Sequence, residues 1–187
     1  MTDDDSGPLD ALPAWRFAIR IYSETKVPES LIFLQNRLGL DVSLFLFLLH
    51  LSFVQGKFLD KTDVESLRRF IADWHDQVVT PLRAVRQAMK KSGDLFGSPA
   101  ILAFRNVIAT TELKAEQIEM ALCQNWVTSR MASRSIRADA GYEGVAEIAS
   151  MSVKNADASL RDHNVTEAIN IVGEAITRTI ASLAPFR

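Results

Sequence analysis

The residue types best suited to acid–base chemistry occur together in the run Trp74-His75-Asp76. A histidine beside an acid can act as a general base, and a tryptophan can form the wall of a pocket. Successive helix residues point about 100° apart, so we expect Trp74 to face the core while His75 and Asp76 turn away from it. The run therefore favours an ordinary helix surface, and we assign no catalytic residue.

Three acidic residues, Glu112, Glu116 and Glu119, share the i, i+4, i+7 spacing of one helix face. Carboxylates on facing helices can bind a divalent metal in a helical bundle, usually with Glu-x-x-His pairs. No histidine follows these acids at the third position, and no second carboxylate helix is evident. We expect a solvated acidic face paired with Lys or Arg, no metal and no other cofactor. Glu116→Gln should then change stability by less than about 0.5 kcal/mol.

Other candidate residues have simpler interpretations. His50 lies in an apolar run, where it could be a ligand or proton carrier, but a core histidine is favoured. Cys123 has no activating base nearby in sequence, which favours a small core residue over a nucleophile. Four basic residues near the end of one predicted helix could contact phosphate groups, but no aromatic residues that stack on nucleic-acid bases lie between them, so a solvated helix end is favoured. They are Arg83, Arg86, Lys90 and Lys91.

Composition indicates one compact domain. The 187 residues carry 21 Lys and Arg against 23 Asp and Glu, so no strong positive field argues for nucleic-acid binding. The single cysteine excludes an internal disulfide framework. The first residues, M-T-D-D-D-S-G-P, are acidic where a secretory signal would be basic and then apolar, so we expect a cytoplasmic protein.

The apolar run from Leu40 to Val54 must be hidden from water and sets the architecture. At roughly 15 residues it is too short to span a bilayer, which takes about 20. It predicts the central helix of an all-α, single-domain helical bundle, with Asp41 as its N-cap and no membrane span.

Two shorter helices should precede the central one. Trp15, Ala18, Ile19 and Tyr22 have the spacing of one buried face of a helix from about Pro13 to Ser23. A second helix should begin near Val27-Pro28 and end at Gly39. Its buried side should consist of Leu31, Leu34 and Leu38.

Two long helices should follow as an antiparallel hairpin. The run Thr62 to Glu65 reads as a capping box, and Pro81 should kink or break the first helix near 78–80. The second should run from Pro99 to about Arg130. Its three glutamates should then lie closer to Arg68 and Arg69 than to the basic end of the first helix. The expected apolar stripe of the first helix is Leu67, Phe70, Ile71, Trp74, Val78, Leu82, Val85 and Met89. That of the second is Ile101, Phe104, Ile108, Ala115, Ile118, Leu122 and Trp126.

The rest of the chain is less strongly patterned. Residues 129–144 read as a link, followed by a weaker helix over 145–156. The last helix has a stripe of Val165, Ile169, Val172, Ile176, Ile180 and Leu183. We therefore divide the chain into a flexible acidic leader (1–12), a helical core domain (13–130) and a C-terminal helical extension (131–187) that could form an interface.

Several blocks resemble a family of small proteobacterial proteins known chiefly as a domain of unknown function. They are W-R-F-A-I-R-I-Y at 15–22, L-Q-N-R-L-G-L-D-V at 34–42, W-H-D-Q-V-V-T-P-L-R at 74–83 and E-L-K-A-E at 112–116. The resemblance covers about Leu12 to Cys123. It implies a helical cytoplasmic bacterial protein and carries no activity onto particular residues.

Two functions remain open from sequence. No P-loop, Rossmann glycine pattern, serine elbow or zinc signature is present, which favours a non-enzymatic interaction or regulatory module. Its partner would be another protein or a second copy bound through the last helix. The alternative is a small-molecule-binding protein or enzyme with a pocket between helices. Its expected ligand-binding residues are Tyr22, Phe45, His50 and Trp74, with Trp15 as a further wall.

Overall fold

The computed structural model describes residues 9–91, 98–130, 142–153 and 162–183. Within these ranges the chain is helical and contains no β-strand, with one isolated bridge between Leu40 and Val153. The all-α, single-domain prediction is confirmed. The predicted leader falls mostly outside the described residues, as does most of the predicted link.

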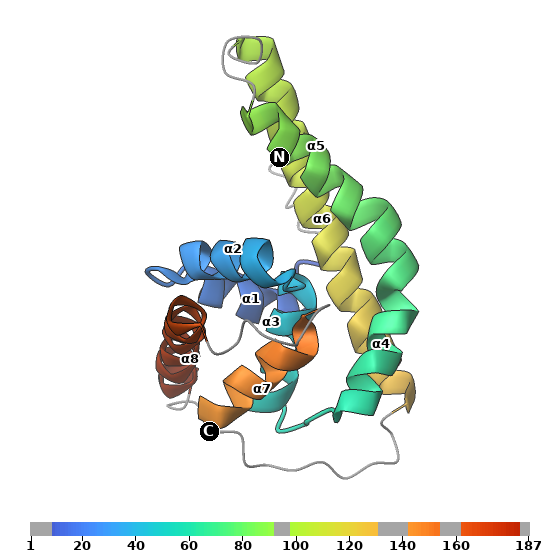
Figure 1. Cartoon of the computed structure of the whole chain (residues 1–187). Coiled ribbons are helices and arrows are strands. Elements are labelled where there is room, and N and C mark those ends of the chain that lie inside the picture. The colour runs from blue at the N-terminus through green and yellow to red at the C-terminus, as the bar shows by residue number, and fades with distance from the viewer. Residues whose placement is uncertain (1–8, 92–97, 131–141, 154–161, 184–187) are drawn as a thin grey trace, which may run out of the picture.

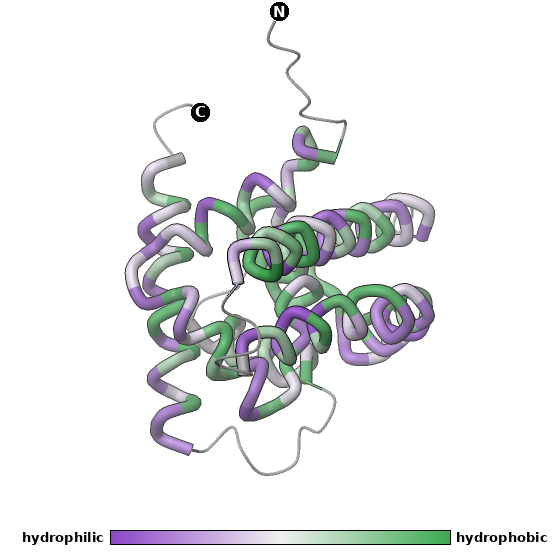
Figure 2. The backbone as a smooth tube through the Cα atoms, turned by 90° about the horizontal axis from the view of Figure 1, so that it is seen from above, coloured by the Kyte–Doolittle hydropathy of each residue, from purple (hydrophilic) through white to green (hydrophobic). Residues whose placement is uncertain are grey.

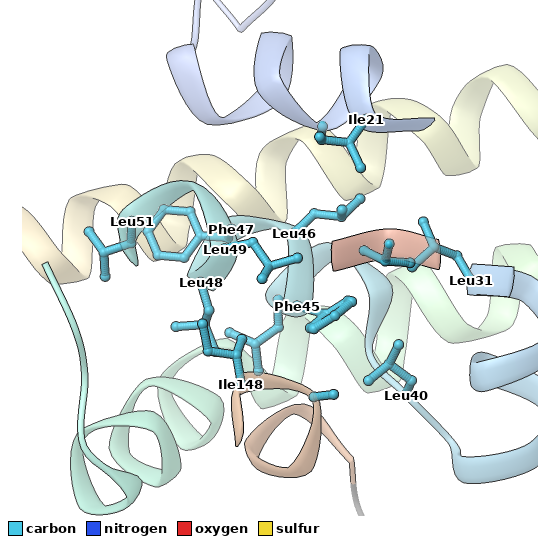
Figure 3. Packing of buried hydrophobic residues seen from close by; sticks show 14 of the residues in the cluster. Ile21, Leu31, Leu40, Phe45, Leu46, Phe47, Leu48, Leu49, Leu51 and Ile148 are labelled. Atoms are coloured by element: carbon cyan, nitrogen blue, oxygen red, sulfur yellow. The ribbon is translucent and has the colours of Figure 1, made fainter. Parts of the chain in front are cut away.

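The predicted central helix is α3 (Val42–Phe53). Every side chain from Ser43 to Ser52 is buried, and the helix packs against α1, α6 and α7. Figure 3 shows Phe45 and Phe47 among leucines of the same helix, with Ile21, Leu31 and Ile148 around them. Asp41 caps the helix by accepting a hydrogen bond from the Leu44 backbone N–H at 3.0 Å, as predicted.

The two preceding helices are α1 (Pro13–Tyr22) and α2 (Val27–Leu38). Helix α2 buries Leu31, Leu34 and Leu38 as predicted, and Gly39 ends it at φ 65°, in the left-handed region. The predicted face of α1 was wrong in part: Ile19 and Tyr22 are exposed. The side chains of α1 that are buried are Ala14, Trp15, Phe17, Ala18 and Ile21.

The next helical stretch consists of α4 (Lys61–Trp74), a π-helical turn η1 (His75–Val79) and α5 (Thr80–Lys91). The predicted break is therefore present, but as a π-turn at 75–79 before Pro81. A π-turn replaces the usual i→i+4 backbone hydrogen bonds by i→i+5 bonds, and it lies just before Pro81, which has no backbone N–H to donate. After this change of register His75 and Val79 are buried and Val85 is exposed, which corrects the predicted stripe. Phe70, before the turn, is also exposed, so the stripe was wrong there as well.

The capping box at Thr62 and Glu65 was also wrong. The N-cap of α4 lies two residues earlier, at Asp60, whose side chain accepts a hydrogen bond from the Asp63 N–H at 2.8 Å. A carboxylate at the N-cap satisfies a free backbone donor as well as threonine does, and it also favours the positive helix end.

This correction gives a testable contrast. Asp60→Ala is expected to lower the free energy of unfolding by about 1 kcal/mol, whereas Thr62→Ala should change it by less than about 0.5 kcal/mol. Urea unfolding of the two variants measures both values. A larger loss in Thr62→Ala than in Asp60→Ala would restore the capping box.

Helix α6 (Pro99–Arg130) has the predicted bounds and runs antiparallel to the α4–η1–α5 stretch, as Figure 1 shows. One end of this hairpin extends beyond the other helices. The predicted stripe was wrong at Phe104, which is 55% exposed. The buried face instead includes acidic and amide side chains, namely Glu112, Ala115, Gln117, Glu119, Met120, Cys123, Trp126 and Val127.

The C-terminal helices α7 (Tyr142–Ser152) and α8 (His163–Leu183) pack on the same chain. Helix α8 lies against α2 and α7, and its residues Val165, Ile169, Val172 and Ile176 are buried there. Figure 2 shows hydrophobic and hydrophilic residues alternating along the helices, as amphipathic helices require. None of the described helices is long and apolar enough to cross a membrane.

Candidate functional site

Three ionisable side chains from distant parts of the chain meet beside the π-turn. The Nδ1 atom of His75 lies 3.0 Å from Oε2 of Glu119 and 3.3 Å from Oδ2 of Asp41. All three residues are buried, and Glu119 is 0% exposed. We call Asp41, His75 and Glu119 the inner cluster.

Local structure fixes each member of the inner cluster. Oδ1 of Asp41 accepts from the first turn of α3, so Oδ2 is left to face His75. The Asp41 N–H donates to the Ser152 carbonyl at 3.1 Å, which ties this residue to the end of α7. His75 is the first residue of η1, and Glu119 comes from the middle of α6. The cluster thus joins three separate parts of the fold.

Burial and charge set the protonation of this cluster. Burial, with the charge of Asp41, raises the pKa of Glu119 to about 7 against the opposing effect of His75. Burial alone would lower the pKa of His75, but the hydrogen bond with Glu119 and the two nearby carboxylates raise it. The pKa of both Glu119 and His75 is therefore raised, and for His75 the rise shows how strongly these two buried groups interact.

A second ionic group lies between α5 and α6. Arg83 donates from Nε to Oε1 of Glu112 at 3.2 Å and from Nη2 to Oε1 of Glu116 at 2.6 Å. Arg86 forms two hydrogen bonds with Glu112. Planar guanidinium groups suit such paired contacts with carboxylates. Burial raises the pKa of Glu116, although the charge of Arg83 opposes the rise. We call these four residues the arginine–glutamate group.

These contacts confirm that the acids pair with arginine but overturn the solvated acidic face, and they overturn the solvated basic helix end for Arg83 and Arg86. Lys90 is exposed as predicted, and the side chain of Lys91 lies outside the described residues. Glu112 is 4% exposed and Glu119 fully buried, whereas the predicted basic neighbours of these acids lie elsewhere. Arg68 donates to the carbonyls of Met151 and Val153 at the end of α7, and Arg69 to that of Glu65. The hairpin was predicted correctly, but its register brings Glu112 opposite Arg83 and Arg86.

Two cavities open beside these groups. The larger, about 410 Å³, lies among α1, α2, α3, α5 and α6 and touches the arginine–glutamate group. Its other walls are mostly apolar and include Trp15, Ile19, Ile32, Leu46 and Met120. The smaller, about 400 Å³, is lined by Asp41, Arg68, Arg69, Ile71, Ala72, His75, Asp76 and Ser152, so two members of the inner cluster face it.

Comparison with known proteins places the chain in a family. A family model described as "Protein of unknown function (DUF2390)" matches residues 13–123, which is more than half of the chain. The chain belongs to the DUF2390 family. This confirms the resemblance to a family of unknown function and the extent of the chain that it covers. No curated protein and no solved structure matches the chain.

The DUF2390 segment contains the inner cluster, the arginine–glutamate group and every lining residue of the larger cavity. Helices α7 and α8 lie beyond it. Helix α7 nevertheless supports the segment, since its last residue, Ser152, accepts the Asp41 N–H and lines the smaller cavity.

The four expected ligand-binding residues do not meet in one cavity of the DUF2390 fold. Tyr22, with Trp15, lines the larger cavity. Phe45 and His50 are packed in the core, where His50 lies beside Phe17 with ring centres 5.5 Å apart. Trp74 donates from Nε1 to the Ala115 carbonyl at 3.0 Å, which fixes α4 against α6. Ligand binding by these four remains a prediction.

Sequence reasoning did not consider Asp41 as a site residue, weighed Glu119 as a metal ligand but favoured a solvated face, and assigned His75 to the helix surface. Asp41 was predicted as a helix N-cap, a role that uses only one of its two carboxylate oxygens. Glu119 is followed by the apolar run M-A-L-C, a signal that its helix face is buried. Pro81, six residues after His75, signalled the local break but not which side chains it would turn inward. Cys123 is buried as expected, and burial raises the pKa of its thiol.

His50 gives a prediction on acid stability. Burial lowers the pKa of His50 to about 4, from 6.5 in an unfolded chain. Between these values the unfolded chain binds a proton that the folded chain does not, so stability falls as the pH falls. From pH 7.5 to 4.5, wild type should lose about 2.5 kcal/mol more unfolding free energy than His50→Leu.

Urea unfolding of both proteins at the two pH values measures this difference. At pH 7.5 His50→Leu should be at least as stable as wild type, because His50 Nδ1 is buried without a hydrogen-bond partner among the described residues. The same pH dependence in both proteins would contradict a neutral core histidine.

Proposed function

We propose that this protein binds a small amphipathic molecule with one anionic group in the larger cavity. The observation that carries the proposal is a cavity of about 410 Å³ whose lining is mostly apolar but includes five charged side chains. Small-molecule sites are usually concave and apolar, with volumes of about 300 to 1,000 Å³ and a few polar groups that fix orientation. We infer no reaction from this arrangement.

The mouth of the cavity supports an apolar ligand body. Four large side chains lining it, Ile19, Tyr22, Ile32 and Leu113, are exposed, each by more than a third of its surface. They come from the consecutive helices α1 and α2 and from the distant helix α6. Grouped exposed apolar residues of this kind are typical of binding surfaces.

The charged side chains that line the cavity support an anionic head group. Three arginines, Arg83, Arg86 and Arg105, line the cavity with two acids, Glu112 and Glu116, which leaves one positive charge in excess. Arg83 and Arg86 are satisfied by these acids. Nε of Arg105 is buried without a hydrogen-bond partner among the described residues. Arg105 is therefore the residue that we expect to bind a ligand carboxylate.

Thermal unfolding in a panel of straight-chain carboxylates and the alcohols of equal length tests the proposal. We expect octanoate or decanoate to raise the melting temperature of wild type more than the matching alcohol does. Arg105→Gln should weaken carboxylate binding about tenfold, or about 1.4 kcal/mol, and leave alcohol binding unchanged. Arg16→Gln, an exposed arginine outside the cavity, is the matched control.

A wild-type protein that gains no stability from any of these carboxylates would contradict the proposal. Equal weakening in Arg105→Gln and Arg16→Gln would contradict the role of Arg105, because both substitutions change the net charge equally.

A second candidate is an interaction module that self-associates through the exposed side of α6. Phe104 and Val107 are 55% and 58% exposed on the hairpin that extends beyond the other helices. This surface differs from the last helix first expected to form the interface, because the apolar stripe of α8 packs on α2 and α7. Light scattering decides the case: a dimer that Phe104→Ser converts to a monomer would support it, and a monomeric wild type would exclude it.

A further inference from the structure

We propose that the inner cluster of Asp41, His75 and Glu119 binds one divalent transition-metal ion, a site separate from the larger cavity. The inference does not depend on the proposed ligand. It rests on the donor set, the spacing of the three ligand atoms, an unpartnered buried oxygen and an open side toward the smaller cavity.

The spacing suits coordination to a single ion. Ligand atoms bound at about 2.1 Å, with angles of about 90° to 109°, lie about 3.0 to 3.4 Å apart. The two measured separations from His75 Nδ1 are 3.0 Å and 3.3 Å, and the three ligand atoms all lie within 4.8 Å of one another. One imidazole nitrogen and two carboxylates form a donor set suited to Zn²⁺, Fe²⁺ or Mn²⁺.

Hydrogen bonding alone leaves the inner cluster unsatisfied. Nδ1 of His75 carries at most one proton but faces two carboxylate oxygens. The Glu119 side chain is fully buried, and its Oε1 atom has no hydrogen-bond partner among the described residues. An unsatisfied buried carboxylate oxygen is costly, and a metal ion would supply its missing partner.

Charge balance points the same way. When both carboxylates are ionised, an imidazolium leaves the cluster with a net charge of −1, whereas a divalent ion with a neutral imidazole makes it neutral. Nearby arginines do not correct the deficit, because Arg83 is shared by Glu112 and Glu116 and Arg68 binds the end of α7. Buried charges are normally paired or coordinate metals.

The surroundings provide orientation and access. The Asp41 carboxylate is held by the Leu44 N–H, the kind of outer contact that orients a metal ligand. His75 lies in a π-turn, a feature frequent at functional sites. Asp41 and His75 line the smaller cavity, so the remaining coordination positions would face water or a small ligand there.

Calorimetric titration of the EDTA-treated full-length chain with Zn²⁺ and with Mn²⁺ tests the site. We expect one ion per chain for at least one metal. Glu119→Gln keeps the size of the side chain but removes its charge, so it should weaken binding at least about 100-fold. Glu65→Gln, exposed on α4, should bind as wild type does.

Stability without metal separates ligation from folding. Glu119→Gln should unfold at the same or a higher temperature than the metal-free wild type, because Asp41 remains to pair with His75 and the second, excess carboxylate charge is removed. His75→Ala provides a second ligand variant, which should also lose binding. The proposal is overturned if wild type binds neither ion at one per chain, or if Glu119→Gln and His75→Ala bind as tightly as Glu65→Gln.

Discussion

Phe47→Ala is expected to lower the free energy of unfolding by about 3 to 5 kcal/mol. Phe47 is fully buried in α3, where it is surrounded by core side chains rather than solvent. Alanine would remove the buried ring and leave a cavity that close-packed neighbours cannot fill completely. The loss is a large part of the usual net stability of a domain, about 5 to 15 kcal/mol.

Urea unfolding at pH 7.5 measures this loss. Phe104→Ala is the matched control, because Phe104 is 55% exposed on α6 and its removal should cost less than about 1 kcal/mol. A loss of less than about 1 kcal/mol for Phe47→Ala would contradict α3 as the centre of the core.

Arg83→Met should lower the free energy of unfolding by about 3 to 5 kcal/mol at neutral pH. Arg83 forms ion pairs with Glu112 and Glu116, and its own side chain is largely buried between the helices. Methionine preserves much of the apolar stem but leaves Glu116 without its cation and Glu112 with Arg86 alone. Breaking a buried ion pair is costly because one charge stays uncompensated.

The control for this prediction is Arg178→Met. Arg178 pairs with Glu24 on the surface, at 3.1 Å, and half of its side chain is exposed. Exposed ion pairs contribute about 0 to 1 kcal/mol, so we expect a small loss. Equal losses in the two variants would contradict a buried arginine–glutamate group. By the same reasoning Glu116→Gln should cost about 1 to 3 kcal/mol, which replaces the nearly silent change expected from sequence.

Local signals predicted the fold well. The apolar run, the left-handed Gly39 and the Asp41 cap lie within one short segment, so α3 and its start needed no knowledge of the rest of the chain. The buried face of α1 was harder to predict, because two sets of apolar residues share the i, i+3, i+4, i+7 spacing. The predicted set is Trp15, Ala18, Ile19 and Tyr22, and the buried set is Ala14, Phe17, Ala18 and Ile21. Only contacts with α3 and α8 decide between them.

The site could not be predicted in the same way. Asp41, His75 and Glu119 are separated by more than thirty residues at each step and meet only when α3, η1 and α6 pack together. The acids of α6 follow helical spacing that is equally typical of a solvated face. The register of the α5–α6 hairpin and the π-turn, which are tertiary properties, determine that these acids are buried.

Calorimetric titration of a cavity-filling variant with octanoate tests the proposed ligand site most directly. Ala109 lines the larger cavity, so Ala109→Trp should fill it and abolish octanoate binding while the helical circular dichroism is kept. Ala103→Trp, at an exposed position of the same helix, should bind octanoate as wild type does. A folded Ala109→Trp protein with wild-type affinity would contradict ligand binding in this cavity.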